Sequence, residues 1–306
     1  MRREALLAHK IILPAMKYAA MVGTIWRKTV KKKDSKSLEE SVVAAMDGTD
    51  PEIYPYLPYI LQDVWEMGAS PEVMVRLARR HAPQHRELAV IDLGCGKGAV
   101  SVALARMLPC RCLGIDAIDA FIEEARQKAL AFGVADRCSF TTGDIREWVE
   151  RRQVGKGLSR SKVPAATTAP KFDLIVLGAI GPVLGDYFET LTRLSSCLAH
   201  DGIILIDDGY IPDGSTFTHP LIQRKNEIDR QIVRAGMKLV DKEVIGTDDM
   251  QASNKAIHQP LIRRCRELME KHPEQHHLFE GYIRKQEEEI DILENRIVCS
   301  TMVVKR

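Results

Sequence analysis

A short apolar run that ends in three closely spaced glycines constrains the fold of this chain more than any other feature. Residues 88–91 are all apolar, a run too short for a helix and typical of a buried parallel strand. Gly94, Gly96 and Gly98 follow, and a turn without Cβ atoms lets the backbone approach a ligand closely. Apolar residues then recur at helical spacing over 99–107, so the free N–H groups of a helix N-terminus face the turn. This arrangement predicts a site for a carboxylate or a phosphate.

Asp92, two places before the first glycine, distinguishes between the two ligands. A dinucleotide-binding loop has its third glycine one residue later than here, and Asp92 would repel a pyrophosphate. An amino-acid moiety carries an ammonium group beside a carboxylate, and it would gain from both Asp92 and the loop N–H groups. Residues 90–98, Val-Ile-Asp-Leu-Gly-Cys-Gly-Lys-Gly, resemble the first motif of the class I S-adenosylmethionine-dependent methyltransferases.

Later segments resemble the same family over residues 87–208. A second strand at 112–116 ends in Asp116, close to the spacing of about 20 residues at which a Rossmann-type sheet places an acid over a ribose. The resemblance implies an α/β fold with a doubly wound, mostly parallel, seven-stranded sheet whose last strand is antiparallel. The other expected elements are helices at 117–132 and 220–235, strands at 137–141, 171–178, 203–208, 237–245 and 297–304, and a turn at 198–202.

The resemblance implies S-adenosylmethionine as the cofactor and assigns its parts to residues. Asp92 and the glycine loop would hold the methionine end and Asp116 the ribose, while Asp144 and the backbone N–H of Ile145 would hold the adenine. Three acids at one edge of a sheet would repel one another without a cationic, hydroxyl-rich ligand. The expected cofactor-binding set is Asp92, Gly94, Cys95, Gly96, Gly98, Asp116, Ala117, Gly143, Asp144, Ile145 and Gly178.

Three residues at or just after the fifth strand are candidates for a catalytic base. Methyl transfer from a sulfonium needs mainly alignment and, for an oxygen nucleophile, a base. Asp208, Tyr210 and His219 could serve, and Asp207 is equally near. Because side chains alternate along a strand, Asp207 and Asp208 point to opposite sides, and at most one of them is expected to face the pocket.

The chain is expected to have four parts. Residues 1–36 form a basic arm with a net charge of +8, which suits contact with an anionic surface but is better explained as a solvated tail. Residues 37–86 form a helical cap, residues 87–247 with 297–306 form the core, and residues 248–296 form a helical hairpin that acts as a lid. Pro14 and Lys17 interrupt the apolar stretch in the arm, so no transmembrane segment is expected.

Tyr54, Tyr56 and Tyr59 in the cap are candidate substrate-site residues, because aromatic rings attract a positively charged sulfonium. Packing of the cap on the sheet is the competing explanation. The odd number of cysteines, seven, favours free thiols in a reducing, cytoplasmic compartment. The histidines near residue 272 lack acidic or cysteine partners at ligand spacing, so no metal is expected.

The predicted activity is methyl transfer to a small molecule. Residues 178–182, Gly-Ala-Ile-Gly-Pro, lack the Asn/Asp-Pro-Pro-aromatic segment of adenine, cytosine and glutamine methylators and the acid of magnesium-dependent catechol-type enzymes. Helical caps on both sides favour an enclosed pocket. Two alternatives stay open: a methyltransferase for protein or RNA that uses the arm and a basic loop at 154–170, and a non-catalytic protein that binds the cofactor and a partner. The chain outside residues 1–36 is mildly acidic, which disfavours a nucleic-acid substrate. A nicotinamide enzyme is a distant alternative. The oligomeric state stays open, with a homodimer as one possibility.

Overall fold

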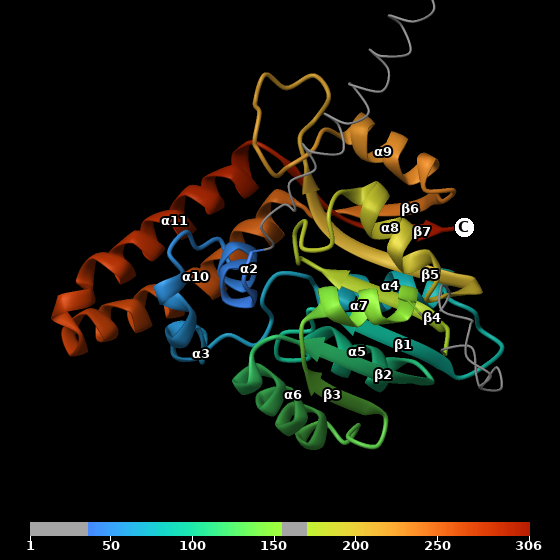
Figure 1. Ribbon diagram of the computed structural model, residues 1–306, viewed down its shortest axis with the longest axis horizontal. Helices are drawn as coiled ribbons and strands as arrows, with labels where there is room; N and C mark the ends of the chain where they lie inside the picture. The colour runs from blue at the N-terminus through green and yellow to red at the C-terminus, as the bar shows by residue number, and fades with distance from the viewer. Residues whose placement is uncertain (1–35, 155–169) are drawn as a thin grey trace, which may run out of the picture. The chain divides into compact units, whose positions relative to one another are not determined.

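A computed structural model describes residues 36–154 and 170–306, and its centre is a seven-stranded sheet (Figure 1). The strand order is β3-β2-β1-β4-β5-β7-β6, and β7 runs antiparallel to both of its neighbours. The predicted parallel sheet with an antiparallel last strand is therefore confirmed. The strands are β1 (Leu88–Leu93), β2 (Cys110–Asp116), β3 (Cys138–Thr142), β4 (Phe172–Gly178), β5 (Leu198–Tyr210), β6 (Lys238–Val244) and β7 (Val298–Lys305).

Helices cover both faces of the sheet, as the doubly wound fold requires. Within β1, Leu88 and Val90 belong to one apolar core, whereas Ile91 and Leu93 belong to the other. Strands buried on both faces read as continuous apolar runs, which is the pattern seen in the sequence. The first core includes α4 (Pro71–His81), α5 (Ala99–Met107) and α6 (Asp119–Ala131), and the second includes α7 (Ile145–Val154), α8 (Tyr187–Ser195) and α9 (Lys225–Arg234).

The helical cap and the hairpin share a third apolar core. Ile53 and Leu57 of the cap pack with Leu261 and Phe279 of the hairpin, and Phe121 of α6 joins them. Figure 1 shows α2 and α3 beside α10 and α11. The two segments expected to cap the site from both sides thus form one helical layer. Its elements are α2 (Leu38–Ala45), η1 (Pro51–Tyr56), α3 (Leu57–Ile60), α10 (Thr247–Lys271), η2 (Pro273–Gln275) and α11 (His276–Asn295).

Two predicted boundaries are wrong. The turn expected at 198–202 lies inside β5, where the pairing with β4 shifts register between Phe172 and Leu174 and absorbs the extra residues. The helix expected from residue 220 begins only at Lys225. The preceding residues form a loop in which the Arg224 guanidinium donates to four backbone carbonyls, those of Pro212, Asp213, Ser215 and Phe217, at 3.0–3.4 Å.

The basic arm at 1–36 and the basic loop at 154–170 lie almost entirely outside the described residues. Within 36–154 and 170–306, no helix combines the length and the apolar character that crossing a membrane requires.

Candidate cofactor and acceptor site

The glycine loop between β1 and α5 adopts a conformation that its three glycines make accessible. Gly94, Gly96 and Gly98 have φ values of +76°, +50° and +76°, a region that L-residues rarely occupy. A Cβ on Gly96 would lie 2.5 Å from the Cε atom of Met67, and one on Gly94 would lie 2.5 Å from Cγ2 of Ile180. The cap segment and the β4–α8 loop therefore lie directly against the loop glycines.

Several loop N–H groups are used within the protein, contrary to their expected role as ligand donors. The N–H groups of Gly94 and Cys95 donate to the Ile115 carbonyl at 2.8 and 3.0 Å, and that of Gly98 donates to the Cys95 carbonyl. The Cys95 side chain is buried against β2, and burial raises the pKa of its thiol. The glycine loop is thus fixed to β2. It would meet a ligand mainly through a surface that lacks Cβ atoms and less through free N–H donors.

Asp92 lies beneath the loop, against the first turn of α5. Its side chain is only 2% exposed, and the Ser101 hydroxyl donates to its Oδ2 at 2.7 Å. Burial raises the pKa of Asp92 to about 7, and the neighbouring charge of Asp116 adds to this, while the hydrogen bonds from Ser101 oppose it. Holding a carboxylate here costs stability, which is expected of a group kept for a ligand.

Asp116 ends β2 and bridges the glycine loop and α6. Its Oδ2 accepts the Gly96 N–H at 2.8 Å, and its Oδ1 accepts the Ile118 N–H at 3.0 Å. Burial raises the pKa of this carboxyl, and backbone hydrogen bonds, including one from Ala117, partly offset the effect. Each carboxylate oxygen can accept a second hydrogen bond, so both can still bind the hydroxyls of a ribose. The Gly143 N–H donates to the Asp116 carbonyl at 2.8 Å and places the next turn beside this site.

Asp144 lies in that turn and is paired with Arg146, a contact that the sequence analysis missed. The Arg146 guanidinium approaches its carboxylate at 2.7 Å and also donates to the Ser41 hydroxyl of α2 at 2.7 Å. Burial raises the pKa of Asp144, but the hydrogen bonds and charge of Arg146 outweigh burial and leave the pKa below its usual value. Ile145 is buried in the second core. The cap is thereby linked to the predicted adenine-binding acid.

Asp207 and Asp208 point to opposite sides of β5, as alternation predicts. Asp207 accepts a hydrogen bond from the Thr301 hydroxyl of β7 at 2.5 Å, whereas Asp208 accepts one from the Tyr187 hydroxyl of α8 at 2.7 Å. Burial raises the pKa of both carboxyls, that of Asp207 to about 6. Asp207 lies level with Gly178, its partner at the end of β4, so both acids are near the edge where the methyl group would lie.

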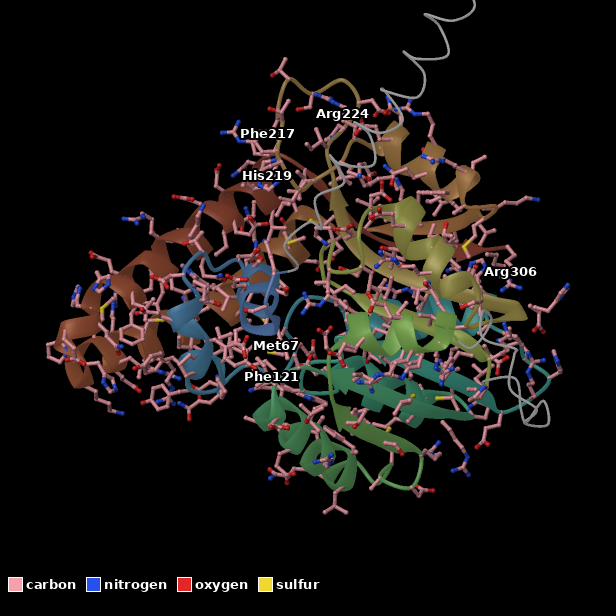
Figure 2. All side chains as sticks on the ribbon, viewed as in Figure 1. Met67, Phe121, Phe217, His219, Arg224 and Arg306 are labelled. Carbon is pink, nitrogen blue, oxygen red and sulfur yellow. The ribbon has the colours of Figure 1, made fainter. Side chains whose placement is uncertain are left out.

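Tyr210 and His219 are held in ways that fit a catalytic base less well. The Tyr210 hydroxyl accepts a hydrogen bond from Lys242 of β6 at 2.6 Å, two strands beyond β5. His219 Nδ1 accepts the backbone N–H groups of Leu221 and Ile222, which assigns the proton of a neutral ring to Nε2. Figure 2 shows His219 near the upper end of α11, away from the end of β4 that would face the acceptor.

The three cap tyrosines separate into two groups. Tyr56 donates to Gln275 and Tyr59 donates to Glu267, each at 2.5 Å, so both hydroxyls bind the hairpin segment. Tyr54 packs against the third core, and burial and then the negative charges of Glu39, Asp116 and Asp119 raise its pKa. Of the three, Tyr54 is therefore the one that stays a candidate substrate-site residue, because the hydroxyls of the other two are used by the hairpin segment.

Lys97, which no sequence signal marks as a site residue, lies between two loop glycines and is only 1% exposed. Its ammonium is 2.7 Å from Glu124 Oε2 and donates to the Leu61 carbonyl at 2.7 Å. In the described part of the chain, no group of three or more His, Cys, Asp or Glu side chains is arranged to hold a metal ion.

The comparisons with known proteins agree with this geometry. Residues 84–256, more than half of the chain, match a family model described as a methyltransferase domain. A methyltransferase from Geobacter sulfurreducens, solved with S-adenosyl-L-homocysteine, has a TM-score of 0.62 at 20% identity and covers 82% of this chain and 97% of its own. A methyltransferase from Thiobacillus denitrificans, solved with the same ligand, has a TM-score of 0.62 at 19% identity and covers 81% of this chain and 97% of its own. A cyclopropane synthase from Mycobacterium tuberculosis has a TM-score of 0.62 at 11% identity and covers 90% of this chain and 100% of its own.

At such identities the solved structures establish the fold alone, and no curated protein matches the sequence. The match to the family model over residues 84–256 shows the family, which the fold alone does not. An acid lies at or next to the carboxyl end of each of the first three strands, beside a glycine loop whose three φ values are positive. The chain belongs to the class I S-adenosylmethionine-dependent methyltransferases.

Proposed function

We propose that this protein transfers the methyl group of S-adenosylmethionine to a small-molecule acceptor by in-line displacement. The observation that carries the proposal is the alignment of Asp92, Asp116 and Asp144 at one edge of the sheet around the glycine loop. S-adenosyl-L-homocysteine in the Geobacter sulfurreducens methyltransferase of the same fold supports it.

The chain's own residues would divide the binding of the cofactor among them. The glycine loop would pack against the methionine end, with Asp92 supplying the negative charge that an ammonium group needs. Asp116 would accept the ribose hydroxyls through both oxygens, and Asp144 would accept the adenine amine beside its ion pair with Arg146. When bound, the cofactor supplies an activated methyl group on a sulfonium.

Acceptor chemistry would take place at the ends of β4 and β5. Asp208 is half-buried and held by Tyr187, so its position is fixed by hydrogen bonding. Its carboxylate could take the proton that an oxygen or nitrogen acceptor loses as it is methylated. Asp207 is the other carboxylate at this level, but it is buried and bound to Thr301.

The segments packed around the glycine loop support a small acceptor over a polymer. Met67 and Ile180 lie against the loop glycines, and the helical layer formed by the cap and hairpin contacts α6 beside the site. All seven cysteines are buried free thiols, which supports the predicted cytoplasmic location.

Titration with S-adenosyl-L-homocysteine tests the cofactor assignment. Replacing Asp116 by Ala removes both carboxylate oxygens, and we expect the dissociation constant to rise more than about tenfold, or about 1.4 kcal/mol. The exposed Asp136, which lies on the α6–β3 connection, is a matched control, and Asp136→Ala should leave the affinity unchanged. Equal affinities of wild type and Asp116→Ala would refute the ribose assignment.

A further inference from the structure

Lys97 connects the glycine loop to two other elements through a buried ammonium group. The group pairs with Glu124 of α6, donates to the Leu61 carbonyl just after α3, and lies 5.6 Å from the centre of the Phe121 ring. Figure 2 places Phe121 and Met67 at the junction of α6 and the cap segment. A lysine is almost never fully buried unless it is paired, so these contacts fix the conformation of its side chain and of the loop around it.

One short stretch of the cap, residues 59–65, holds Lys97 at two points. The Leu61 carbonyl accepts a hydrogen bond from the Lys97 ammonium, and Trp65 Nε1 donates one to the Lys97 backbone carbonyl at 3.0 Å. The loop is therefore attached to this stretch through both the side chain and the main chain of one residue.

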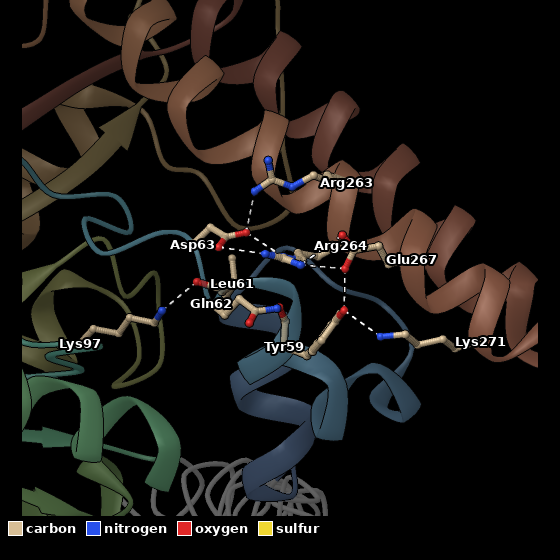
Figure 3. Close-up of polar contacts among 9 residues, drawn as sticks. All are labelled: Tyr59, Leu61, Gln62, Asp63, Lys97, Arg263, Arg264, Glu267 and Lys271. Atoms are coloured by element: carbon tan, nitrogen blue, oxygen red, sulfur yellow. Dashed lines mark hydrogen bonds and ion pairs between the residues drawn. The ribbon is translucent and has the colours of Figure 1, made fainter.

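The same stretch is attached to α10 (Figure 3). The Asp63 carboxylate accepts from Arg263 and Arg264, each at 2.7 Å, and the Tyr59 hydroxyl donates to Glu267. Lys271 donates to the Tyr59 hydroxyl at 3.0 Å. Contacts to the hairpin and contacts to the glycine loop thus alternate along seven residues. Because Leu61 is only two residues before Asp63, a displacement of Asp63 would also move the Leu61 carbonyl.

We propose that Lys97 is a positioning residue that couples docking of the α10–α11 hairpin to the conformation of the glycine loop, so that cofactor affinity depends on the ion pairs of Asp63. This inference rests on the proposed function, because it takes the glycine loop as the floor of the cofactor site. The coupling is reciprocal: a bound cofactor would stabilise the docked hairpin by the same factor.

Asp63→Asn tests the coupling with a substitution that lies outside the glycine loop and leaves the Lys97 side chain in place. We expect its dissociation constant for S-adenosyl-L-homocysteine to rise roughly fivefold to tenfold, within the usual range of coupling between sites. Asp241→Asn is a matched control, because Asp241 also accepts from two basic side chains, Arg80 and His81, but joins α4 to β6. An unchanged affinity in Asp63→Asn, or an equal loss in both variants, would overturn the proposal.

A double-mutant cycle shows whether Lys97 carries the effect. In a Lys97→Met background, Asp63→Asn should change the affinity by less than about twofold, because the ammonium contact to the Leu61 carbonyl is already lost and only the main-chain bond from Trp65 remains. Additive losses would overturn the role of Lys97.

Hydrogen exchange of the free protein provides a readout that needs neither the ligand nor a stable Lys97 variant. Amides of residues 94–98 should exchange faster in Asp63→Asn and at the wild-type rate in Asp241→Asn; unchanged exchange in Asp63→Asn would overturn the coupling. If wild type failed to bind S-adenosyl-L-homocysteine, the proposed function would fail, and the exchange rates would still decide whether hairpin and loop are coupled.

Discussion

Replacing Asp92 by Asn should make the protein more stable and less able to bind its cofactor. Asp92 is buried and accepts a hydrogen bond from the Ser101 hydroxyl. An asparagine side chain of the same size can keep that hydrogen bond through its amide oxygen. The substitution therefore removes a buried negative charge with little change in packing.

The size of the gain follows from the pKa of Asp92, which burial raises from its ordinary value of 3.8 to about 7. Because the folded-state pKa lies above the unfolded one, the contribution of Asp92 to stability is fully present below about pH 4 and is lost as the pH rises through about 7. The linkage relation gives a cost of up to about 4 kcal/mol at pH 8 and up to about 1.6 kcal/mol at pH 5. The neutral amide avoids this cost at every pH.

Urea unfolding of both proteins at pH 5 and pH 8 measures this difference. We expect Asp92→Asn to raise the free energy of unfolding by about 1–4 kcal/mol at pH 8 and by less than half of that gain at pH 5. Asp136→Asn, at an exposed position, should change it by less than about 0.5 kcal/mol at either pH. A variant no more stable than wild type at pH 8, or a gain that does not depend on pH, would contradict the reasoning.

Two further predictions concern the glycine loop and the β5–α9 loop. Gly96→Ala should lower cofactor affinity more than about tenfold and lower the free energy of unfolding by about 1–3 kcal/mol, because φ is +50° and the new Cβ would meet Met67. The control Gly133→Ala, where φ is +68° but the space is open, should lower the free energy of unfolding by about 1 kcal/mol and leave the affinity unchanged. If titration and unfolding gave equal results for the two variants, the steric argument would be refuted. Arg224→Ala should speed proteolytic cleavage within residues 211–224 while lowering the free energy of unfolding by less than about 2 kcal/mol, and an unchanged cleavage rate would show that the guanidinium does not order this loop.

The sequence could predict the core of the fold because its signals are local. The apolar runs of β1 and β4 and the glycines between β1 and α5 fix those elements to within about two residues. The hairpin at 248–296 was also readable, and the structure divides it between α10 and the short η2 turn that begins at Pro273. The start of α9 was not readable, because Arg224 orders the preceding loop through tertiary hydrogen bonds that leave no periodic pattern.

The candidate site divides along the same line. The positions of Asp116 and Asp144 in the fold could be predicted, because Asp116 ends β2 and Asp144 follows β3. Lys97 could not, since its partners Leu61 and Glu124 come from distant segments and nothing in a Gly-Lys-Gly triplet shows that the lysine turns inward. Nor could the sequence show that Tyr56 binds the hairpin, because aromatic spacing is the same for packing and for ligand contact.

Transfer of labelled methyl from S-adenosylmethionine into a cell extract separated by size tests the central claim most directly, with the Asp116→Ala protein as control. We predict label in the low-mass fraction with wild type and little or none with the variant. Label in protein or RNA would contradict the small-molecule acceptor and assign a function to the basic arm. Retention of the cofactor without transfer to any fraction would contradict catalysis.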